Sequence, residues 1–245
     1  MGKTGLALGT VLLLAASALA RPAKNGSKDA SHVVDSGTFG VFVNGQRVAT
    51  ETFSIEQDAT GSVVTSQFKS APGVDDASQS SELQLASNSS LVKYEWKELS
   101  PARVEAVVAP DGNFLMERTN APGQKKPQEQ PFLLPPSTVI LDDYFFVDRE
   151  ILAWKYLATS CRRDNGQLQC PVNRPTQFGA LNPHSRSSMM VSVEFAKREA
   201  VTIGGKQREL NRFTLRNEGD EWSLWLDDQF KLIRIDAGNT QVVRD

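Results

Sequence analysis

The sequence predicts a mainly β protein in which one curved antiparallel sheet wraps around a single buried α-helix. Short stretches alternate apolar and polar residues: within residues 91–97, Val92, Tyr94 and Trp96 fall on one face and charged residues fall on the other. Such strands keep one face dry and one face wet. Turn signals rich in Gly, Pro and Asn-Gly separate them. One longer segment, 138–160, instead repeats apolar residues every three or four positions, as a helix does.

The first twenty residues have the pattern of a cleavable secretory signal. Lys3 supplies the charge, residues 6–16 form the apolar stretch, and the small-x-small run 18–20 predicts cleavage after Ala20. The alternative is an N-terminal membrane anchor, but the apolar run is shorter than the roughly 20 residues that a span needs. The signal predicts a periplasmic or secreted location. No later segment has the length and apolar character of a spanning helix, so after cleavage we expect a protein that is not integral to the membrane.

The charge balance gives no electrostatic reason to expect nucleic acid as a partner. The chain has 27 basic and 29 acidic residues, and 40% of its residues are hydrophobic. A nearly neutral chain lacks the basic surface that phosphate backbones attract. The apolar content is typical of a soluble domain, and 225 residues after cleavage can bury a sizeable core.

The part after the signal is expected to form a single domain over residues 38–245, preceded by a flexible lead-in. Residues 21–37 are polar and without periodicity, which is typical of flexible segments. The domain then opens with two strands around Asn44-Gly45, the strongest short-range hairpin signal in the chain. The expected strands occupy 38–43, 48–55, 62–69, 82–86, 91–98, 102–108, 113–119, 189–195, 207–215, 221–226, 230–235 and 240–243.

The remaining segments are expected to be loops and one helix. Residues 70–81 and 176–186 are polar or irregular, and 121–137 contains five prolines, which forbid a helix or a central strand. The helix is expected over 138–160, with Asp142 or Asp143 as its N-cap. It is apolar over more than half of its circumference, so it should be buried on most sides.

Two cysteines, Cys161 and Cys170, predict one disulfide. The intervening residues include Asn165-Gly166, a turn signal, so the bond would close a hairpin-like loop. In an oxidising compartment this is the ordinary state of such a pair. Metal binding and redox chemistry are the alternatives, but the spacing is neither a zinc pattern nor Cys-x-x-Cys.

Aromatic residues are the main candidates for a ligand site. They can line a cavity between helix and sheet for an acyl chain or another apolar ligand. The alternative, which we favour, is that they simply pack as core. The candidate lining residues are Tyr94, Trp96, Tyr144, Phe145, Phe146 and Trp154. Trp222 and Trp225 should point to opposite faces of one strand, one into the core and the other toward a protein contact or the proline-rich loop.

No residues form a recognisable catalytic or metal-binding motif. His184 would have to carry a histidine-based metal site or a Ser-His-Asp triad, but it lies in an irregular loop and Gly-x-Ser-x-Gly is absent. The paired acids Asp142-Asp143 and Asp227-Asp228 can bind calcium or act as acid and base. Helix capping and turn formation are the better interpretations of these two pairs. We therefore expect no catalytic residue, no metal and no cofactor.

Two ends of the chain resemble exported bacterial proteins of unknown function. Residues 39–51 (Phe-Gly-Val-Phe-Val-Asn-Gly-Gln-Arg-Val-Ala-Thr-Glu) resemble their opening hairpin, and 222–235, from Trp-Ser-Leu-Trp-Leu-Asp-Asp to Ile-Arg-Ile, resembles the closing one. Residues 140–146 (Ile-Leu-Asp-Asp-Tyr-Phe-Phe) are similar to the central helical segment. These are families of the DUF3108 and DUF6134 kind, similar in outline to periplasmic lipoprotein carriers. The resemblance implies a half-barrel that cradles hydrophobic groups, with a helix closing the bowl.

Three functions are compatible with these features. The leading hypothesis is an exported binding or carrier module, not an enzyme, that holds a lipid, another apolar ligand or a partner segment between sheet and helix. The second is a structural or interaction protein of the cell envelope without a cavity, which would contact an envelope partner through an exposed apolar patch. The third is an uncharacterised hydrolase, which would need polar groups converging near His184 or the aspartate pairs.

Overall fold

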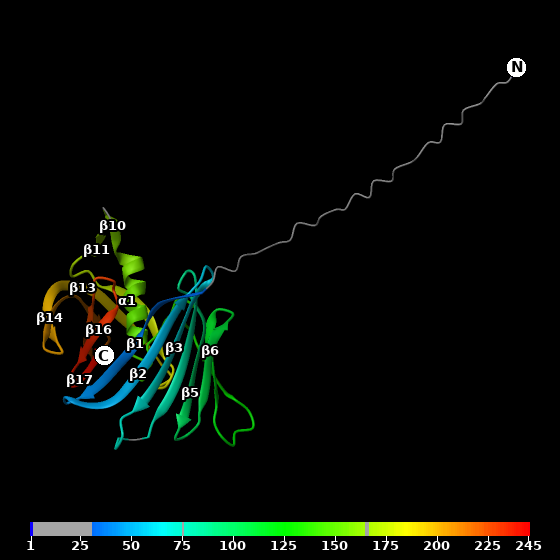
Figure 1. The fold of residues 1–245 in the computed structure, drawn as a ribbon. Helices are drawn as coiled ribbons and strands as arrows, with labels where there is room; N and C mark the ends of the chain where they lie inside the picture. The colour runs from blue at the N-terminus through cyan, green and yellow to red at the C-terminus, as the bar shows by residue number, and fades with distance from the viewer. Residues whose placement is uncertain (2–30, 75, 165–166) are drawn as a thin grey trace. The chain divides into compact units, whose positions relative to one another are not determined.

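Fifteen strands of the computed structural model form one open sheet, and α1 is the single helix among the described residues, which are 1, 31–74, 76–164 and 167–245. The fold class expected from the sequence is confirmed: a mainly β chain with a curved, unclosed sheet around one helix (Figure 1). The expected signal peptide lies outside the described residues.

The elements are β1 (His32–Val43), β2 (Gln46–Gln57), β3 (Gly61–Ser70), β4 (Ser78–Ala86), β5 (Leu91–Ser100), β6 (Glu105–Asp111), β7 (Phe114–Asn120), β8 (Gln128–Phe132), β9 (Val139–Ile140), α1 (Val147–Ser160), β10 (Arg162–Asp164), β11 (Gln167–Gln169), β12 (Thr176–Asn182), β13 (Ser187–Ile203), β14 (Lys206–Arg216), β15 (Glu221–Leu226), β16 (Leu232–Ala237) and β17 (Thr240–Arg244).

The sheet consists of two meanders joined by the first and last strands. Its order is β8-β7-β6-β5-β4-β3-β2-β1-β17-β16-β15-β14-β13-β12-β9, and the pairs are antiparallel except for β9 with β12. Strand β1 pairs with β17 over Phe39 to Val43, so the N-terminal and C-terminal strands meet near the middle of the sheet. Short β8 and β9 form its two edges, which limits the length of unpaired backbone.

Alternation along the strands sends one set of side chains toward α1. Phe39, Phe53 and Tyr94 are buried on this inner face, and they belong to one core cluster that also contains Leu152 and Tyr156 of α1. The helix touches both meanders. Phe146, just before α1, donates its backbone N–H to Glu51 of β2, and the Tyr156 hydroxyl accepts the backbone N–H of Phe195 in β13 at 3.1 Å. Wrapping one sheet around one helix lets a single core serve both.

The lead-in expected over residues 21–37 is wrong for its last part. Strand β1 begins at His32, six residues before the expected domain start at Thr38. The reason is tertiary: Asp35 is 2% exposed and pairs with Arg244 at 2.8 Å and with Lys231 at 2.9 Å. The polar residue Asp35 therefore belongs to a buried ion cluster within β1.

The helix is shorter than the expected 138–160. Residues 139–140 form the edge strand β9, and the helix begins only at Val147, after a loop. Its N-cap residue is Phe146, without a side-chain cap hydrogen bond, so neither Asp142 nor Asp143 has the expected role. The apolar periodicity of the sequence extends from the loop into the helix because the loop is buried as deeply as the helix. Leu141 and Phe145 of the loop belong to the same core.

Three expected loops contain strands. Strand β4 begins inside the expected loop 70–81, at Ser78. The proline-rich segment 121–137 contributes β8, which pairs only with β7, so its Pro131 occupies an edge strand, where a missing N–H is tolerated. The expected irregular segment 176–186 contains β12, whose last three residues are all buried and therefore show no alternation.

A bulge changes the faces at the start of β5. Tyr94 and Trp96 are buried as expected, but Val92 is 48% exposed and Leu91 is buried in its place. The pairing of β4 with β5 shifts register between Gln84 and Leu85, which opposes Leu85 to Leu91. A bulge reverses the alternation on one side of it.

The two tryptophans of β15 face opposite sides, as expected, but neither is fully exposed. Trp222 is partly buried and lies under the Arg149 guanidinium, 4.8 Å from the ring centroid. Trp225 is 8% exposed and packs with Leu210 and Ile233 in a small second cluster. The expected exposed contact at one of these rings is therefore not present.

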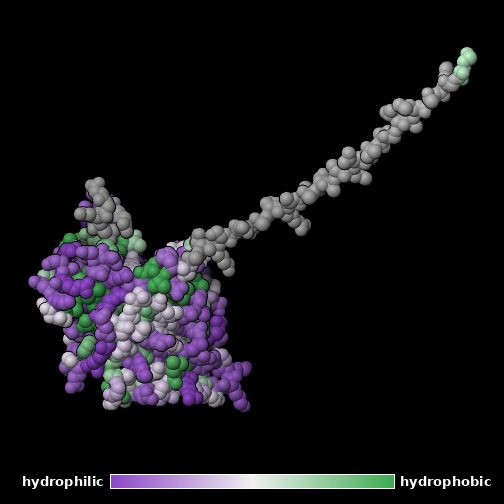
Figure 2. Space-filling view, in the orientation of Figure 1, coloured by the Kyte–Doolittle hydropathy of each residue, from purple (hydrophilic) through white to green (hydrophobic). Residues whose placement is uncertain are grey.

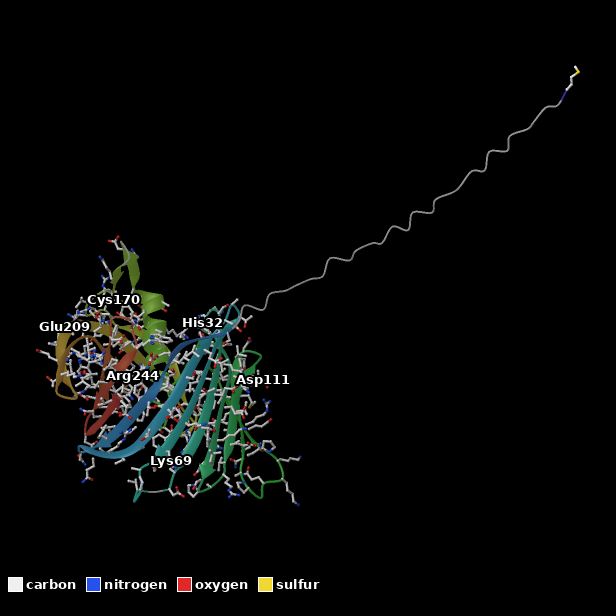
Figure 3. All side chains as sticks on the ribbon, in the orientation of Figure 1. His32, Lys69, Asp111, Cys170, Glu209 and Arg244 are labelled. Atoms are coloured by element: carbon white, nitrogen blue, oxygen red, sulfur yellow. A yellow bond between two sulfur atoms is a disulfide. The ribbon has the colours of Figure 1, made fainter. Side chains whose placement is uncertain are left out.

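The disulfide expected between Cys161 and Cys170 is confirmed. It directly follows α1 and closes the two-stranded β10–β11 hairpin, and Figure 3 places Cys170 beside the C-terminal end of the helix. The Asn-Gly turn expected between these strands lies outside the described residues. Within the described part of the chain, no helix is long and apolar enough to cross a lipid bilayer.

Candidate functional site

A cavity of about 250 Å³ lies between α1 and the inner face of β1 to β5. The helix packs closely elsewhere, so the space between helix and sheet is partly filled and partly hollow. Figure 2 shows a mostly polar surface with small apolar patches, one of them where the start of β1 approaches α1, beside this cavity. Nine aliphatic residues dominate the wall: Val34, Ile55, Leu83, Leu85, Leu91, Val139, Ile140, Ile151 and Leu152.

Residues on one face of α1 line the cavity along its length. Asp148, Ile151, Leu152, Lys155 and Ala158 line it, a spacing that keeps them on one face of a helix. Asp148 is 2% exposed, whereas Ala158 lies at the surface. The cavity is therefore closed at the Asp148 end and open at the Ala158 end, about 15 Å apart at 1.5 Å per residue.

Lys155 brings a cation to the open half of this cavity. Its Nζ donates to the carbonyl of Ser137 at 2.5 Å and of Ser89 at 3.4 Å. Partial burial lowers the pKa of Lys155 below its ordinary value. Among the described residues, no carboxylate oxygen forms an ion pair with this ammonium within 4.0 Å. An ammonium has three donors, so one remains available beside the two carbonyls.

Asp148 closes the other end, where burial disfavours the charged form of its carboxyl group. Burial, together with the neighbouring carboxyl of Asp142, raises the pKa of Asp148 well above its ordinary value. Its Oδ2 accepts the backbone N–H of Asp142 at 3.2 Å, which fixes the side chain to the loop before the helix. The closed end therefore offers a polar group that is held in place by the backbone and whose neutral form is favoured by burial.

Only one of the six expected lining residues borders the cavity. Trp154 lines it, and its ring N–H donates to the Phe230 carbonyl at 2.6 Å. Phe145 and Phe146 are buried just before the helix, and Tyr94, Trp96 and Tyr144 lie around His184. For these five, the interpretation as core is the better one, and the wall is aliphatic because the strands place Leu and Ile side chains opposite the helix stripe.

His184 is held in a buried polar cluster. Its ring stacks on Trp96, with centroids 3.9 Å apart, and Nδ1 lies 2.7 Å from Asp142 Oδ2. The same oxygen accepts the hydroxyl of Tyr94 at 2.6 Å. On the other side of the ring, Nε2 lies 2.7 Å from Gln79 Oε1. The cluster thus ties the turn after β12 to strands β4 and β5.

This cluster resembles part of a hydrolase triad but is arranged for structure. A triad needs the second ring nitrogen directed at a hydroxyl or thiol nucleophile. At His184 that nitrogen faces the side-chain amide of Gln79. Asp142 is committed as well, since its Oδ1 accepts the Tyr144 N–H at 2.9 Å. The geometry is therefore that of a rigid structural support for the loop, and it does not favour a hydrolytic function.

The second aspartate pair has the expected turn role. Oδ1 of Asp227 accepts the backbone N–H groups of Gln229 at 2.9 Å and Lys231 at 3.0 Å. Asp228 is exposed and pairs with Arg198 at 2.6 Å. Within the described residues, no group of three or more His, Cys, Asp or Glu side chains is placed to hold a metal ion.

Glu51 replaces the missing cap of α1 from a distant strand. Its Oε2 accepts the N–H of Phe146 at 2.7 Å, and its Oε1 accepts that of Val147 at 3.3 Å and contacts Ser66 Oγ at 2.7 Å. These N–H groups at a helix N-terminus have no partner within the helix. Burial raises the pKa of Glu51 to about 7. Strand β2 thus fixes where the helix, and with it the cavity stripe, begins.

A second buried cluster fixes the seam between the two meanders. Arg244 of β17 reaches Asp35 of β1, and Figure 3 shows Arg244 beside that strand. Gly37 provides the room, because a Cβ there would lie 2.8 Å from the Arg244 Nη2 atom. Burial beside Asp35 raises the pKa of Glu150 well above its ordinary value.

No family model, curated protein or solved structure matches this chain. The resemblance to exported bacterial families therefore stays an expectation, and the functional argument depends on the geometry of the cavity.

Sequence reasoning missed the polar members of the site. Lys155 and Asp148 both fall within the expected helix, seven residues apart, so one helical face was predictable from spacing. Which face borders a void depends on the sheet, however. Glu51 and Asp35 gave no signal, because a single acid in a strand has the same local pattern whether it is solvated or buried.

Proposed function

We propose that this chain is an exported binding module, periplasmic or secreted, that holds a small apolar ligand between α1 and the inner face of β1 to β5. The cavity of about 250 Å³ carries this proposal. Its walls are mainly aliphatic and its open end lies at exposed Ala158. An apolar chain moved from water into this space gains about 0.8 kcal/mol for each buried CH₂ group.

The size of the cavity limits the ligand. Sites for drug-sized ligands usually measure about 300–1,000 Å³, and an apolar cavity of about 150 Å³ is enough for benzene. At about 250 Å³, this cavity suits one short chain or one small ring and not a whole lipid. A carrier of larger lipids would have to open the space between helix and sheet further.

The experiment is to block the open end and measure binding of 1-octanol by isothermal titration calorimetry. Ala158→Trp puts a large ring at the mouth from an exposed position, so it should not disturb the core. Thr159→Trp, the next exposed residue and outside the cavity wall, is the matched control. We expect the wild-type protein and the control to bind and Ala158→Trp to lose most of the affinity. Absence of binding in the wild type, or equal binding in both variants, would overturn the proposal.

One observation favours the second candidate, an interaction protein of the cell envelope. Leu133, directly after edge strand β8, is 93% exposed. An apolar side chain beside an open strand edge is suited to contact with another protein. Pull-down from an envelope extract with wild-type protein and with Leu133→Asp tests this candidate. Loss of a partner in the variant would support it, and identical partner sets would count against it.

A further inference from the structure

We propose that the ligand is a linear amphiphile with an anionic head, of the class of medium-chain carboxylates, whose head pairs with Lys155 and whose chain extends along α1 toward Asp148. This inference rests on the proposed function, because it assigns a chemical class to the occupant of the same cavity.

The shape of the cavity favours a chain. Its helical wall extends from Asp148 to Ala158, about 15 Å at 1.5 Å per residue. A volume of about 250 Å³ spread over that length is narrow. A long, narrow space lined mainly by aliphatic residues fits a single extended alkyl chain better than a fused ring system.

The charge inside the cavity favours an anionic head. Lys155 is half-buried and its known partners are two neutral carbonyls, of Ser137 and Ser89. A partly buried ammonium without a carboxylate loses hydration that neutral carbonyls replace incompletely. A carboxylate at the remaining donor would form a charge-assisted hydrogen bond, which is stronger than a neutral one.

The closed end sets the orientation of the ligand. Asp148 is 2% exposed, and burial raises its pKa, which disfavours a charged group at this end. Around it the wall is formed by Ile140 and Leu152, both nearly fully buried. Solvent access and positive charge therefore coincide at the Lys155 end, and the apolar tail belongs at the other end.

The test compares octanoate with 1-octanol, which has the same chain without the charge, on the purified protein by isothermal titration calorimetry. Lys155→Met keeps the length of the side chain and removes its charge. Lys97→Met removes the same charge from the outer face of β5, where Lys97 pairs with Glu95, and is the matched control. Lys155→Arg keeps a cation at the site and is the rescue variant.

We expect octanoate to bind at least about tenfold more tightly than 1-octanol, because the charged head adds a strong hydrogen bond. Lys155→Met should remove that advantage, so that it binds octanoate no more tightly than 1-octanol, whereas Lys97→Met should keep the wild-type ratio of the two affinities. Affinity should also rise about fourfold for each CH₂ added to a shorter carboxylate, as chain burial requires.

The two proposals fail in different ways. If 1-octanol binds but octanoate gains nothing, or if Lys155→Met has no effect, the anionic head is excluded and the apolar cavity stands. If neither compound binds the wild-type protein, the proposed function itself fails.

Discussion

At the scale of single residues, the interior of this protein holds several carboxyl groups in place of a purely apolar core. Glu51, Asp142, Asp148 and Glu150 are all essentially inaccessible to solvent. Three of them have specific structural roles, since Glu51 caps the helix, Asp142 holds His184 and Tyr94, and Asp148 accepts a backbone N–H. Burying a carboxyl group is costly unless it is hydrogen-bonded or protonated, so the stability of this fold should depend on pH.

Glu51 gives the clearest pH dependence. Burial raises its pKa from an ordinary 4.5 to about 7, so the folded state retains a proton that the unfolded state loses. The free energy of unfolding should therefore fall as pH rises from about 4.5 to about 7, by as much as about 3 kcal/mol from this group at 1.4 kcal/mol per pKa unit. Glu51→Gln should reduce this slope, as measured by urea denaturation at about pH 5 and about pH 8.

Glu56→Gln is the control for this prediction. Glu56 lies on the same strand with its side chain exposed, and its contact is a surface hydrogen bond from Ser31. This variant should keep the wild-type slope. Part of the pH dependence of stability should remain in Glu51→Gln, because burial also raises the pKa values of Asp148 and Glu150. Equal slopes in the wild type and Glu51→Gln would contradict the assigned role of Glu51.

Ser66 allows Glu51 to serve in both charge states. Its hydroxyl can donate to an ionised Glu51, or accept from a protonated one while donating to the Thr52 carbonyl at 3.4 Å. None of this was predictable from the sequence. Glu51 lies in an alternating strand, and the partner that gives it a function, the N-terminus of α1, is 95 residues away.

At the scale of elements, α1 and the hairpin after it form one unit that is tied down at both ends. Glu51 holds the N-terminus, and the Cys161–Cys170 bond follows the C-terminus. Between these ends, Trp154 forms a hydrogen bond to the connection between β15 and β16, and Tyr156 forms one to strand β13. Both contacts are with the C-terminal meander. The stripe of Asp148, Ile151 and Lys155, which lines the cavity, lies between these two fixed ends.

Removing the disulfide should cost stability without abolishing binding. We expect Cys161→Ser with Cys170→Ser to lower the free energy of unfolding by about 2–3 kcal/mol, because the closed loop is short. Neither cysteine lines the cavity, so binding of 1-octanol should be retained. Chemical reduction of the wild type should have the same effect, and reductant should leave the double variant unchanged. A loss of 1-octanol binding by a still-folded double variant would contradict this independence.

Local pattern predicted most of the strands but not the extent of the helix. Alternation and turn signals indicated the opening hairpin and the strands of the C-terminal meander near their observed positions. The prediction from local pattern failed where burial on both sides of a strand removed the alternation, as in β12. It also failed where an apolar loop continued the helical spacing, as at Phe145. The cavity prediction named aromatic residues, whereas the observed wall is mainly aliphatic, with Trp154 as its aromatic member and Asp148 and Lys155 among its polar ones.

At the scale of the whole molecule, the pairing of β1 with β17 joins two meanders into one sheet. These strands are the eighth and ninth in the order of fifteen. Their inner face carries Asp35 and Arg244 beside the apolar Val41 and Val242, so the seam has both an ion pair and a packed core. The first and last strands of the described residues are therefore central to the sheet.

Hydrogen exchange should reflect this arrangement. We expect backbone amides of β1 and β17 over Phe39 to Val43 and Thr240 to Arg244 to exchange slowly, like those of β2 and β16. Amides of edge strands β8 and β9 should exchange faster, since each has one neighbour only. The measurement is native-state exchange followed by mass spectrometry of peptides. Faster exchange at the seam than at the edges would contradict the central position of the terminal strands.

The sequence by itself determined the mainly β class, the rough position of most strands, the presence of one buried helix, and the cysteine pair that forms the disulfide. These follow from local periodicity, turn chemistry and residue spacing. Only the tertiary structure decided that Asp35 belongs to the fold, that Glu51 caps α1, and that Lys155 borders a narrow apolar cavity. The physical reason is that burial and partnership of a polar side chain depend on segments far away in the chain, which no local pattern contains.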